Sequence, residues 1–196
     1  GGGRQQWNIP GDAKLVAGMG VVSARKGTDR FVEVARQAIA SDDRVYFTWI
    51  GDFDDSGLSR QIKTAYEEER YPRQLIFTGP MAYAPTNLLP FDLFFLSSVE
   101  DPYPLVVLEA AYQGVPSVCF ANSGGITEFA GEGAGYILAD GSAADTAESL
   151  VTILQDPESR DAVAAAAREK VTKLHSDPEG LLGIFDTIIY QLKNRI

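Results

Sequence analysis

The chain has 196 residues and a formal net charge of -10 at pH 7. With 45% hydrophobic and 22% charged residues, its composition is that of a globular protein, and its length suits one large domain better than two. The negative charge argues against a nucleic-acid backbone or an anionic membrane as the main partner, because either would attract clustered Lys and Arg. We therefore predict no nucleic-acid partner.

The single cysteine, Cys119, lies in an apolar run and is interpreted as a small core residue. One cysteine cannot build a disulfide framework or a cysteine-based metal site. No apolar stretch approaches the ~20 residues of a transmembrane helix, and no signal peptide is visible. We therefore predict a cytoplasmic protein without a transmembrane segment. Residues 1–12 are interpreted as a tail or linker remnant, and the chain is expected to be part of a longer protein.

Strand-like and helix-like segments alternate along the chain. β-rich apolar runs predict strands at 14–20, 45–50, 74–78, 91–96, 117–120 and 135–138. Helical spacing or helix-forming composition predicts helices at 28–40, 56–70, 105–113, 145–155, 157–175 and 178–194.

The apolar strands are continuous rather than alternating, which indicates a sheet buried on both faces. Strand–helix–strand repetition then predicts an α/β fold, a Rossmann-like doubly wound parallel sheet with C-terminal helices, over residues 13–196. In such folds ligands bind beyond the carboxyl ends of the strands, so the loops at that edge are the candidates for function.

Glu109 is the only charged residue between Pro102 and Ala121. Its neighbours are apolar on every side of a helical wheel, which predicts a helix buried all round. An unpaired buried carboxylate costs several kcal/mol, so Glu109 must be paired or must reach a cleft. Without further context, a Glu that makes a structural hydrogen bond explains the pattern equally well.

The start of the same helix is suited to an anion. Pro104 fits the first turn, where its missing N–H is not needed, and the N–H groups of residues 105–107 then point out of the helix. Such an end attracts anions through its free donors and the helix dipole. Asp101 and Glu109 would flank this site. Two carboxylates beside a diphosphate are reasonable only if they bind sugar hydroxyls and a cation offsets their charge.

Residues 98–111 resemble the E-x7-E signature of the family-four (group 1) retaining glycosyltransferases of the GT-B fold, with Asp101 in place of the usual first Glu and Glu109 as the second acid. Further matches follow the family's order: Arg25-Lys26-Gly27, Gly114-Val115-Pro116 and Gly124-Gly125-Ile126-Thr127-Glu128. These features cover about residues 13–140, the donor-binding core of the family. The chain thus resembles the C-terminal, donor-binding domain of such an enzyme.

The resemblance implies roles for the matching residues. Lys26 would neutralise charge on the leaving nucleoside diphosphate, and Asp101 would hold hydroxyls of the donor sugar; these two are the catalytic candidates. Glu109 would accept hydrogen bonds from the ribose. The diphosphate would be cradled at the helix start by Tyr103, Pro104, Leu105 and Val106.

Further substrate contacts are expected at the ends of the first and third strands. Gly20 would lie beside the phosphates, and Gly79 and Met81 would lie beside the base. Many relatives carry Gly-Arg where this chain has Gly20-Val21. Arg25 is a candidate substitute for the missing cation; the alternative is that Arg25 is a solvated loop residue.

The resemblance implies a hexosyltransferase that moves a sugar from a nucleoside-diphosphate sugar to an acceptor with retention, without a metal or any cofactor beyond the donor. The acceptor, a glycan, a lipid or a protein, would be bound by an N-terminal domain that this chain lacks. We therefore expect this chain to bind a nucleotide sugar but to transfer poorly by itself.

The sequence also offers three alternatives. Gly18-Met19-Gly20 resembles the start of a dinucleotide fingerprint, but Ser23 occupies the place of the third glycine, which disfavours a dehydrogenase. Asp52-Phe53-Asp54 matches the D-x-D motif of metal-dependent glycosyltransferases, although the residues here are also typical of a turn. A nucleotide-binding module without transfer activity is the non-enzymatic alternative.

Overall fold

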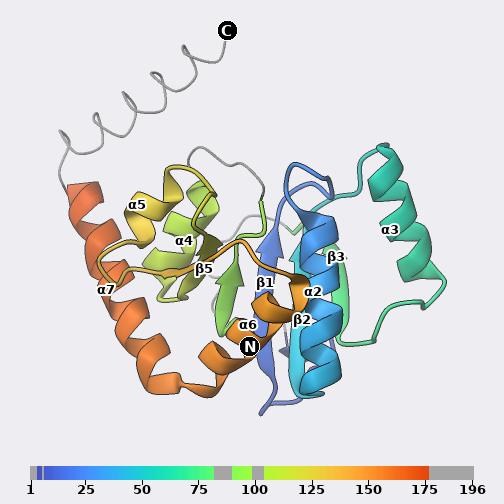
Figure 1. Ribbon diagram of the computed structural model, residues 1–196, viewed down its shortest axis with the longest axis horizontal. Helices are drawn as coiled ribbons and strands as arrows, with labels where there is room; N and C mark the ends of the chain where they lie inside the picture. The colour runs from blue at the N-terminus through green and yellow to red at the C-terminus, as the bar shows by residue number, and fades with distance from the viewer. Residues whose placement is uncertain (1–3, 6, 82–89, 99–103, 177–196) are drawn as a thin grey trace, which may run out of the picture.

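The computed structural model describes residues 4, 5, 7–81, 90–98 and 104–176. They form a six-stranded parallel sheet of order β3-β2-β1-β4-β5-β6 with helices on both faces (Figure 1). The strands are β1 Lys14–Met19, β2 Val45–Ile50, β3 Leu75–Gly79, β4 Leu93–Phe95, β5 Ser117–Phe120 and β6 Tyr136–Leu138. The helices are α2 Thr28–Ser41, α3 Gly57–Glu67, α4 Leu105–Gln113, α5 Ile126–Ala130, α6 Ala143–Gln155 and α7 Pro157–Ser176.

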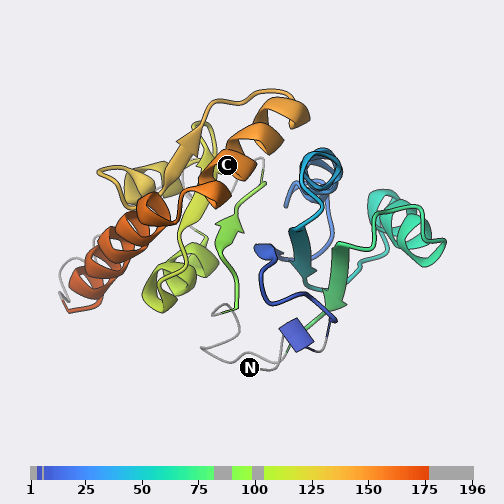
Figure 2. The same cartoon turned by 90° about the horizontal axis from the view of Figure 1, so that it is seen from below.

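Successive strand residues face opposite sides of the sheet and build two cores. In β1, Leu15 and Ala17 pack with residues of α4, α5 and α7, whereas Val16 packs with residues of α2, α3 and α6. β4 divides in the same way, with Phe94 on the first side and Phe95 on the second. Figure 2 shows α2 and α6 on one side of the sheet and α4 on the other. Burial on both faces explains the continuous apolar strands.

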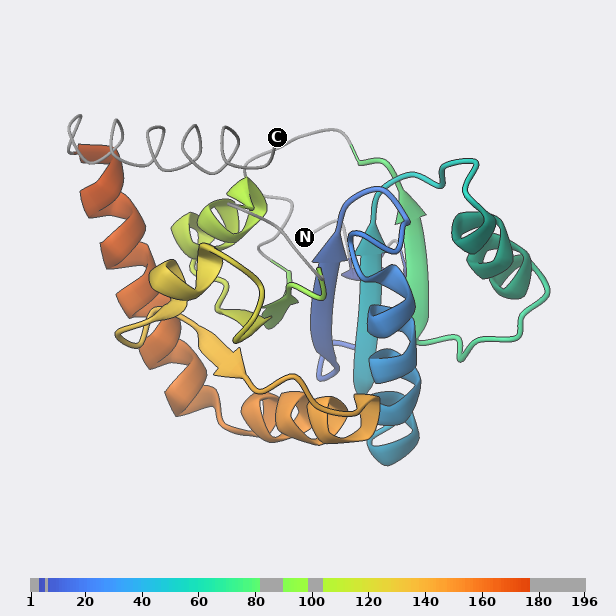
Figure 3. The same cartoon turned by 45° about the horizontal axis from the view of Figure 1, so that its top comes forward.

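The sheet order reverses its direction beside β1. From β1 the chain steps outward to β2 and β3, and it then returns to place β4 on the other side of β1, with Val16 opposite Leu93 and Ala17 opposite Phe94. Figure 3 shows β1, β2 and β3 running side by side, with the loop to α2 leaving the tip of β1. The carboxyl ends of the paired strands β1 and β4 mark the switch point, beyond which doubly wound folds bind ligands.

A cluster of charges closes the opposite, amino-terminal edge of the sheet. Asp92 accepts hydrogen bonds from the Leu15 N–H (2.9 Å) and from the Arg4 guanidinium (3.0 Å). Lys14 Nζ lies 3.6 Å from the same carboxylate, and an Arg160 nitrogen lies 3.8 Å from it. The carboxylate thus joins the segment before β1, both switch-point strands and the start of α7.

Within the predicted tail, the structure places Ile9 in the core at 6% exposure, and Trp7 lies 6.3 Å from Phe91 between ring centroids. These residues therefore pack on the sheet. The domain boundary at residue 13 remains a prediction.

The predicted fold class is confirmed: the sheet is parallel, doubly wound and followed by helices. The short helix α5 was not predicted, because five residues show no helical period. The helix predicted at 178–194 lies outside the described residues. None of the helices that the structure describes combines the length and the apolar character needed to cross a membrane.

Candidate functional site

The loop from Gly20 to Gly27 leaves the carboxyl end of β1. The Trp49 indole N–H donates to the Gly20 carbonyl oxygen at 2.9 Å, and a side chain at Gly51 would overlap that same oxygen. Gly20 has φ 141°, a conformation that favours glycine. A Cβ on Gly20 would lie 3.1 Å from Cγ and 3.2 Å from Cδ of Lys26. The aliphatic part of Lys26 therefore lies across the bare Cα of Gly20.

Hydrogen bonds inside the loop fix its path into α2. The Ser23 N–H donates to Thr28 Oγ1 at 3.1 Å, and the Gly27 N–H donates to the Ala24 carbonyl at 2.9 Å. Thr28 is fully buried. Lys26 is half-buried whereas Arg25 is exposed, so the two neighbouring cations lie in different surroundings. The role of Arg25 as a second phosphate ligand remains a prediction.

The loop also contacts the end of β4 across the switch point. Ser97 Oγ donates to the Lys26 carbonyl oxygen at 3.1 Å, and Gly27 lies against the Ser97 carbonyl. Ser97 and Ser98 lead toward residues 99–103, which include Asp101 and Tyr103 and lie outside the described residues. The structure therefore places Lys26 beside the end of β4, the strand that precedes Asp101 in the chain.

Helix α4 begins shortly after residues 99–103. Pro104 was predicted to lie in the first turn of this helix, but it is the N-cap, one position before that turn. The Pro104 carbonyl oxygen accepts a hydrogen bond from the Val107 N–H at 3.0 Å. Proline has no side-chain acceptor, so it cannot cap the N–H groups of Leu105 and Val106. These two groups are at the positive end of the helix dipole, on the same edge of the sheet as Lys26.

The prediction that this helix is buried all round is wrong. Leu105 is 65% exposed and Tyr112 is 56% exposed, whereas the helix packs on the sheet and α7 through its other face: Val107, Leu108, Ala110 and Ala111. Glu109 follows Leu105 by four residues and precedes Tyr112 by three, so it lies on the open face and is half-buried. A charge is tolerated there because the carboxylate is not enclosed in the core.

Gly79 and Met81, the residues predicted to lie beside the base, follow β3 two strands away from β1. Gly79 has φ 69°, and its carbonyl accepts from the Gly51 N–H at 3.1 Å. Met81 is half-buried against the core on the α4 side. Gly20, Lys26, Gly79 and the start of α4 thus share the carboxyl edge of the sheet.

The D-x-D segment, residues 52–54, lies between β2 and the N-cap of α3 at Ser56. Asp54 accepts a hydrogen bond from the Ser56 N–H at 3.0 Å, and hydrogen bonds from the Ser56 hydroxyl and backbone hold the pKa of that carboxyl below its usual value. Asp52 accepts from the adjacent Phe53 N–H, and the Phe53 ring packs on Phe77 at 5.3 Å. Both carboxylates are exposed. In the part of the chain that the structure describes, no three His, Cys, Asp or Glu side chains are grouped to hold a metal.

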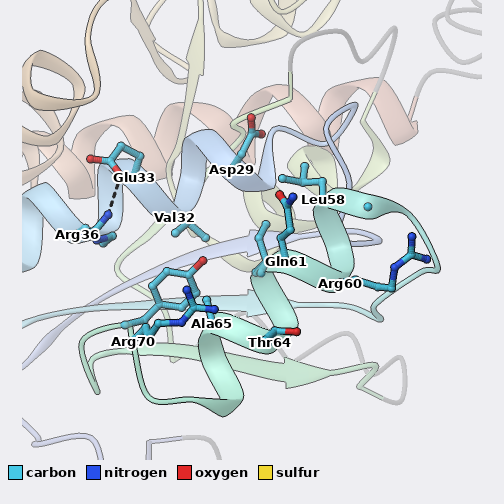
Figure 4. Close-up of a pocket in the computed structure, with 13 residues that line it drawn as sticks. Asp29, Val32, Glu33, Arg36, Leu58, Arg60, Gln61, Thr64, Ala65 and Arg70 are labelled. Atoms are coloured by element: carbon cyan, nitrogen blue, oxygen red, sulfur yellow. Dashed lines mark hydrogen bonds and ion pairs between the residues drawn. The ribbon is translucent and has the colours of Figure 1, made fainter.

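A separate cavity of about 720 Å³ lies between α2 and α3 (Figure 4). Its lining combines apolar side chains such as Val32 and Ile62 with charged ones, among them Arg36, which pairs with Glu33 at 3.2 Å. None of the site residues that the structure describes lines this cavity. It is therefore distinct from the switch-point site.

Three residues that shape the site were missed in the sequence: Trp49, Gly51 and Ser97. Gly51 directly follows a strand and could have been noted as a position of close backbone approach. Trp49 and Ser97 act through hydrogen bonds to β1 and its loop, and those contacts depend on which strands are neighbours.

The family model described as "Glycosyl transferases group 1" matches residues 3–170. An α-galactosylglucosyldiacylglycerol synthase of Streptococcus pneumoniae (strain ATCC BAA-255 / R6) is 33% identical over 104 residues, which cover 50% of this chain and 26% of that protein.

Solved structures share the fold. A crystal structure of Anabaena Alr3699/HepE in complex with UDP has a TM-score of 0.75 and 21% identity, covering 97% of this chain and 51% of that one. The C-terminal domain of the glycosyl transferase group 1 family protein LpcC from Francisella tularensis has a TM-score of 0.70 and 21% identity, covering 89% of this chain and 94% of that one. The chain thus spans about a quarter of the Streptococcus relative and about half of the Anabaena protein.

Proposed function

The chain belongs to the group 1 family of glycosyl transferases, and on this premise we propose that it is the donor-binding domain of an enzyme that transfers a sugar from a nucleoside-diphosphate sugar with retention. The observation that carries the proposal is the placement of Lys26 across Gly20 at the switch point, on the same edge as the start of α4. The loop after β1 supplies a cation, Lys26, and the start of α4 supplies backbone N–H donors. Together these groups suit the binding of a diphosphate.

Each side chain has a role in this proposal. The diphosphate lies at the start of α4, against the N–H groups of Leu105 and Val106. Lys26 supplies positive charge where negative charge develops on the departing nucleoside diphosphate, which is electrostatic stabilisation of the transition state. Glu109, on the open face of α4, accepts hydrogen bonds from the ribose hydroxyls, and Asp101 holds those of the sugar.

The remaining parts of the proposal concern the whole enzyme. The nucleotide-sugar donor is activated by protein groups rather than by a bound metal. The base of the nucleotide lies near Gly79 and Met81. The acceptor, a glycan, a lipid or a protein, is bound by a second domain. The relative from Streptococcus is named as a synthase of a glycolipid, which supports a lipid acceptor among these choices. We place the reaction in the cytoplasm, where nucleotide sugars are available.

Isothermal titration of the chain with UDP, GDP and ADP tests the site. We expect one of them to bind, and Glu109→Ala to weaken that binding about ten- to a hundredfold while the fold is kept, because a charge-assisted hydrogen bond contributes ~1.5–3 kcal/mol. Glu148→Ala on α6, which also removes one helical carboxylate but at an exposed position away from the site, is the control and should leave binding unchanged.

Three outcomes would contradict the proposal or part of it. Absence of binding by all three nucleotides at millimolar concentration would remove the site assignment. A large loss of stability in Glu109→Ala without any effect on nucleotide binding would make Glu109 structural. In the full-length enzyme, a requirement for a divalent metal would instead favour the D-x-D segment at Asp52 and Asp54.

A further inference from the structure

Ser97 lies where β4 ends, directly across the switch point from the loop that carries Lys26. Its side chain is buried, with the residue 2% exposed, and its hydroxyl donates to the Lys26 carbonyl oxygen at 3.1 Å. The two residues are 71 positions apart in the chain. This hydrogen bond therefore joins the two halves of the sheet at the candidate site.

The backbone of Ser97 makes a second contact with the same peptide. Gly27 has φ 64°, and a Cβ at Gly27 would overlap the Ser97 carbonyl oxygen. Ser97 thus holds the Lys26–Gly27 peptide in two ways: its hydroxyl binds the carbonyl of the first residue, and its carbonyl packs against the Cα of the second. Glycine is required at position 27 by both the space and the backbone angle.

The direction of the Lys26 side chain follows from the placement of this peptide. The Lys26 Cα is fixed through its own carbonyl, and the methylenes then extend across Gly20. A lysine stem has four rotatable bonds and is otherwise free to sweep the solvent. Fixing both its root and the surface under it restricts the ammonium group to one side of the switch point.

We propose that Ser97 is a positioning residue for the diphosphate site, acting through Lys26 rather than by touching the ligand. The inference rests on the proposed function, because it takes Lys26 to be the cation of that site. Ser97 also follows β4, the strand that precedes α4 in the chain. Its buried hydroxyl therefore fixes the position of Lys26 relative to the end of β4.

The test compares Ser97→Ala with Ser117→Ala. Ser117 is a buried serine of the neighbouring strand β5, and its hydroxyl has no hydrogen-bond partner among the described residues, so its loss controls for the removal of a buried hydroxyl. We expect Ser97→Ala to weaken UDP binding about three- to tenfold, the effect of one neutral hydrogen bond. Binding of uridine, which has no phosphate, should be unchanged in both variants, and Ser117→Ala should bind UDP like the parent chain.

A double-mutant cycle separates positioning from other effects. In a Lys26→Ala background, Ser97→Ala should weaken UDP binding no further, because there is no ammonium group left to position. Ser97→Cys, which keeps the shape of the side chain with a somewhat larger atom and a weaker donor, should weaken UDP binding in the same direction and serves if the alanine variant does not fold.

The inference is overturned if Ser97→Ala binds UDP like the parent chain, if its loss is as large in the Lys26→Ala background, or if uridine binding falls in parallel. Failure of the proposed function looks different. In that case the parent chain binds none of UDP, GDP and ADP, or Lys26→Ala binds the nucleotide unchanged. If GDP or ADP is the nucleotide that binds, it replaces UDP in these measurements and its nucleoside replaces uridine.

Discussion

Gly18 is packed against two aromatic rings near the carboxyl end of β1. A Cβ at this position would lie 2.7 Å from ring carbons of both Phe31 and Trp49. We expect Gly18→Ala to destabilise the chain by about 1–3 kcal/mol, because overpacking forces neighbouring side chains from their preferred positions. Urea unfolding followed by circular dichroism measures the change.

Gly57, the first residue of α3, provides the matched substitution. A Cβ there would meet nothing within 4 Å. Gly57→Ala should stabilise the chain by about 0.4–1 kcal/mol, since alanine restricts the unfolded chain without strain in the helix. Equal effects at the two glycines would refute the packing argument.

Single residues also show how far the sequence predicts the site. Glu109 is identifiable because no other charge lies near it in the chain, and Lys26 is identifiable because Arg25-Lys26-Gly27 follows the first strand. The open face of α4 is not predictable from its own residues, because α7 decides which face is covered. The hydrogen bond from Trp49 to Gly20 likewise depends on the pairing of β1 with β2.

Helix α6 begins with a reciprocal capping box. The Asp145 N–H donates to the Ser142 hydroxyl oxygen at 3.1 Å, and the Ser142 N–H donates to the Asp145 carboxylate at 3.2 Å. The Ser142 side chain, and after it the backbone, holds the pKa of Asp145 below its ordinary value of 3.8. Because the folded pKa is the lower one, this stabilisation is present above pH 3.8 and is lost as the pH falls through the folded value.

We therefore expect Ser142→Ala to raise the pKa of Asp145 toward 3.8 and to weaken the acid dependence of stability below that pH. Carboxyl NMR titration measures the shift. Asp54, whose pKa is lowered in the same way by Ser56, is the internal control and should titrate as before. An unchanged Asp145 would show that the cap is not the cause.

The elements differ in how well their own residues define them. β2, α4 and β5 have the predicted bounds because glycine or proline stands at one or both ends: Gly51, Pro104, Gly114 and Pro116. α3 was predicted to be longer than observed: the charged residues 68–70 favour a helix, but Glu69 has φ 54°, which ends the helical path of the backbone. α5 is stabilised by its surroundings, where Lys170 binds the carbonyls of Glu128 and Gly131.

Cys119 of β5 reports on the integrity of the whole molecule. The residue is 2% exposed, and burial raises the pKa of its thiol to about 11. At pH 8, three units lower, about one thiol in a thousand is ionised, and the thiolate is the reactive form. We expect labelling by Ellman's reagent to be slow in the native chain and fast in 6 M guanidinium, which is the control.

A ligand should slow the same reaction. If labelling requires global opening, a nucleotide at about 100 times its Kd should reduce the rate about a hundredfold, because it binds only the folded chain. Fast labelling in native buffer, or a rate indifferent to urea, would contradict this description of β5.

At the scale of the whole molecule, the sequence does not predict the order of the strands in the sheet. Alternating elements predict a parallel doubly wound sheet, but several orders satisfy the same alternation and right-handed crossovers. The order found here places β4 beside β1, and only this adjacency brings Lys26 next to Ser97.

That adjacency also has a consequence for the order of folding. The hydrogen bond from the Leu15 N–H to the Asp92 carboxylate joins residues that are 77 positions apart in the chain. The loop that it closes includes all of β2 and β3. β1, β2 and β3 can pair through shorter loops, whereas the β1–β4 contact must first overcome a larger loss of chain entropy. We therefore expect the proposed nucleotide site to form late in refolding, after the half-sheet β1–β2–β3 has formed, so that the onset of ligand binding marks the completion of the fold.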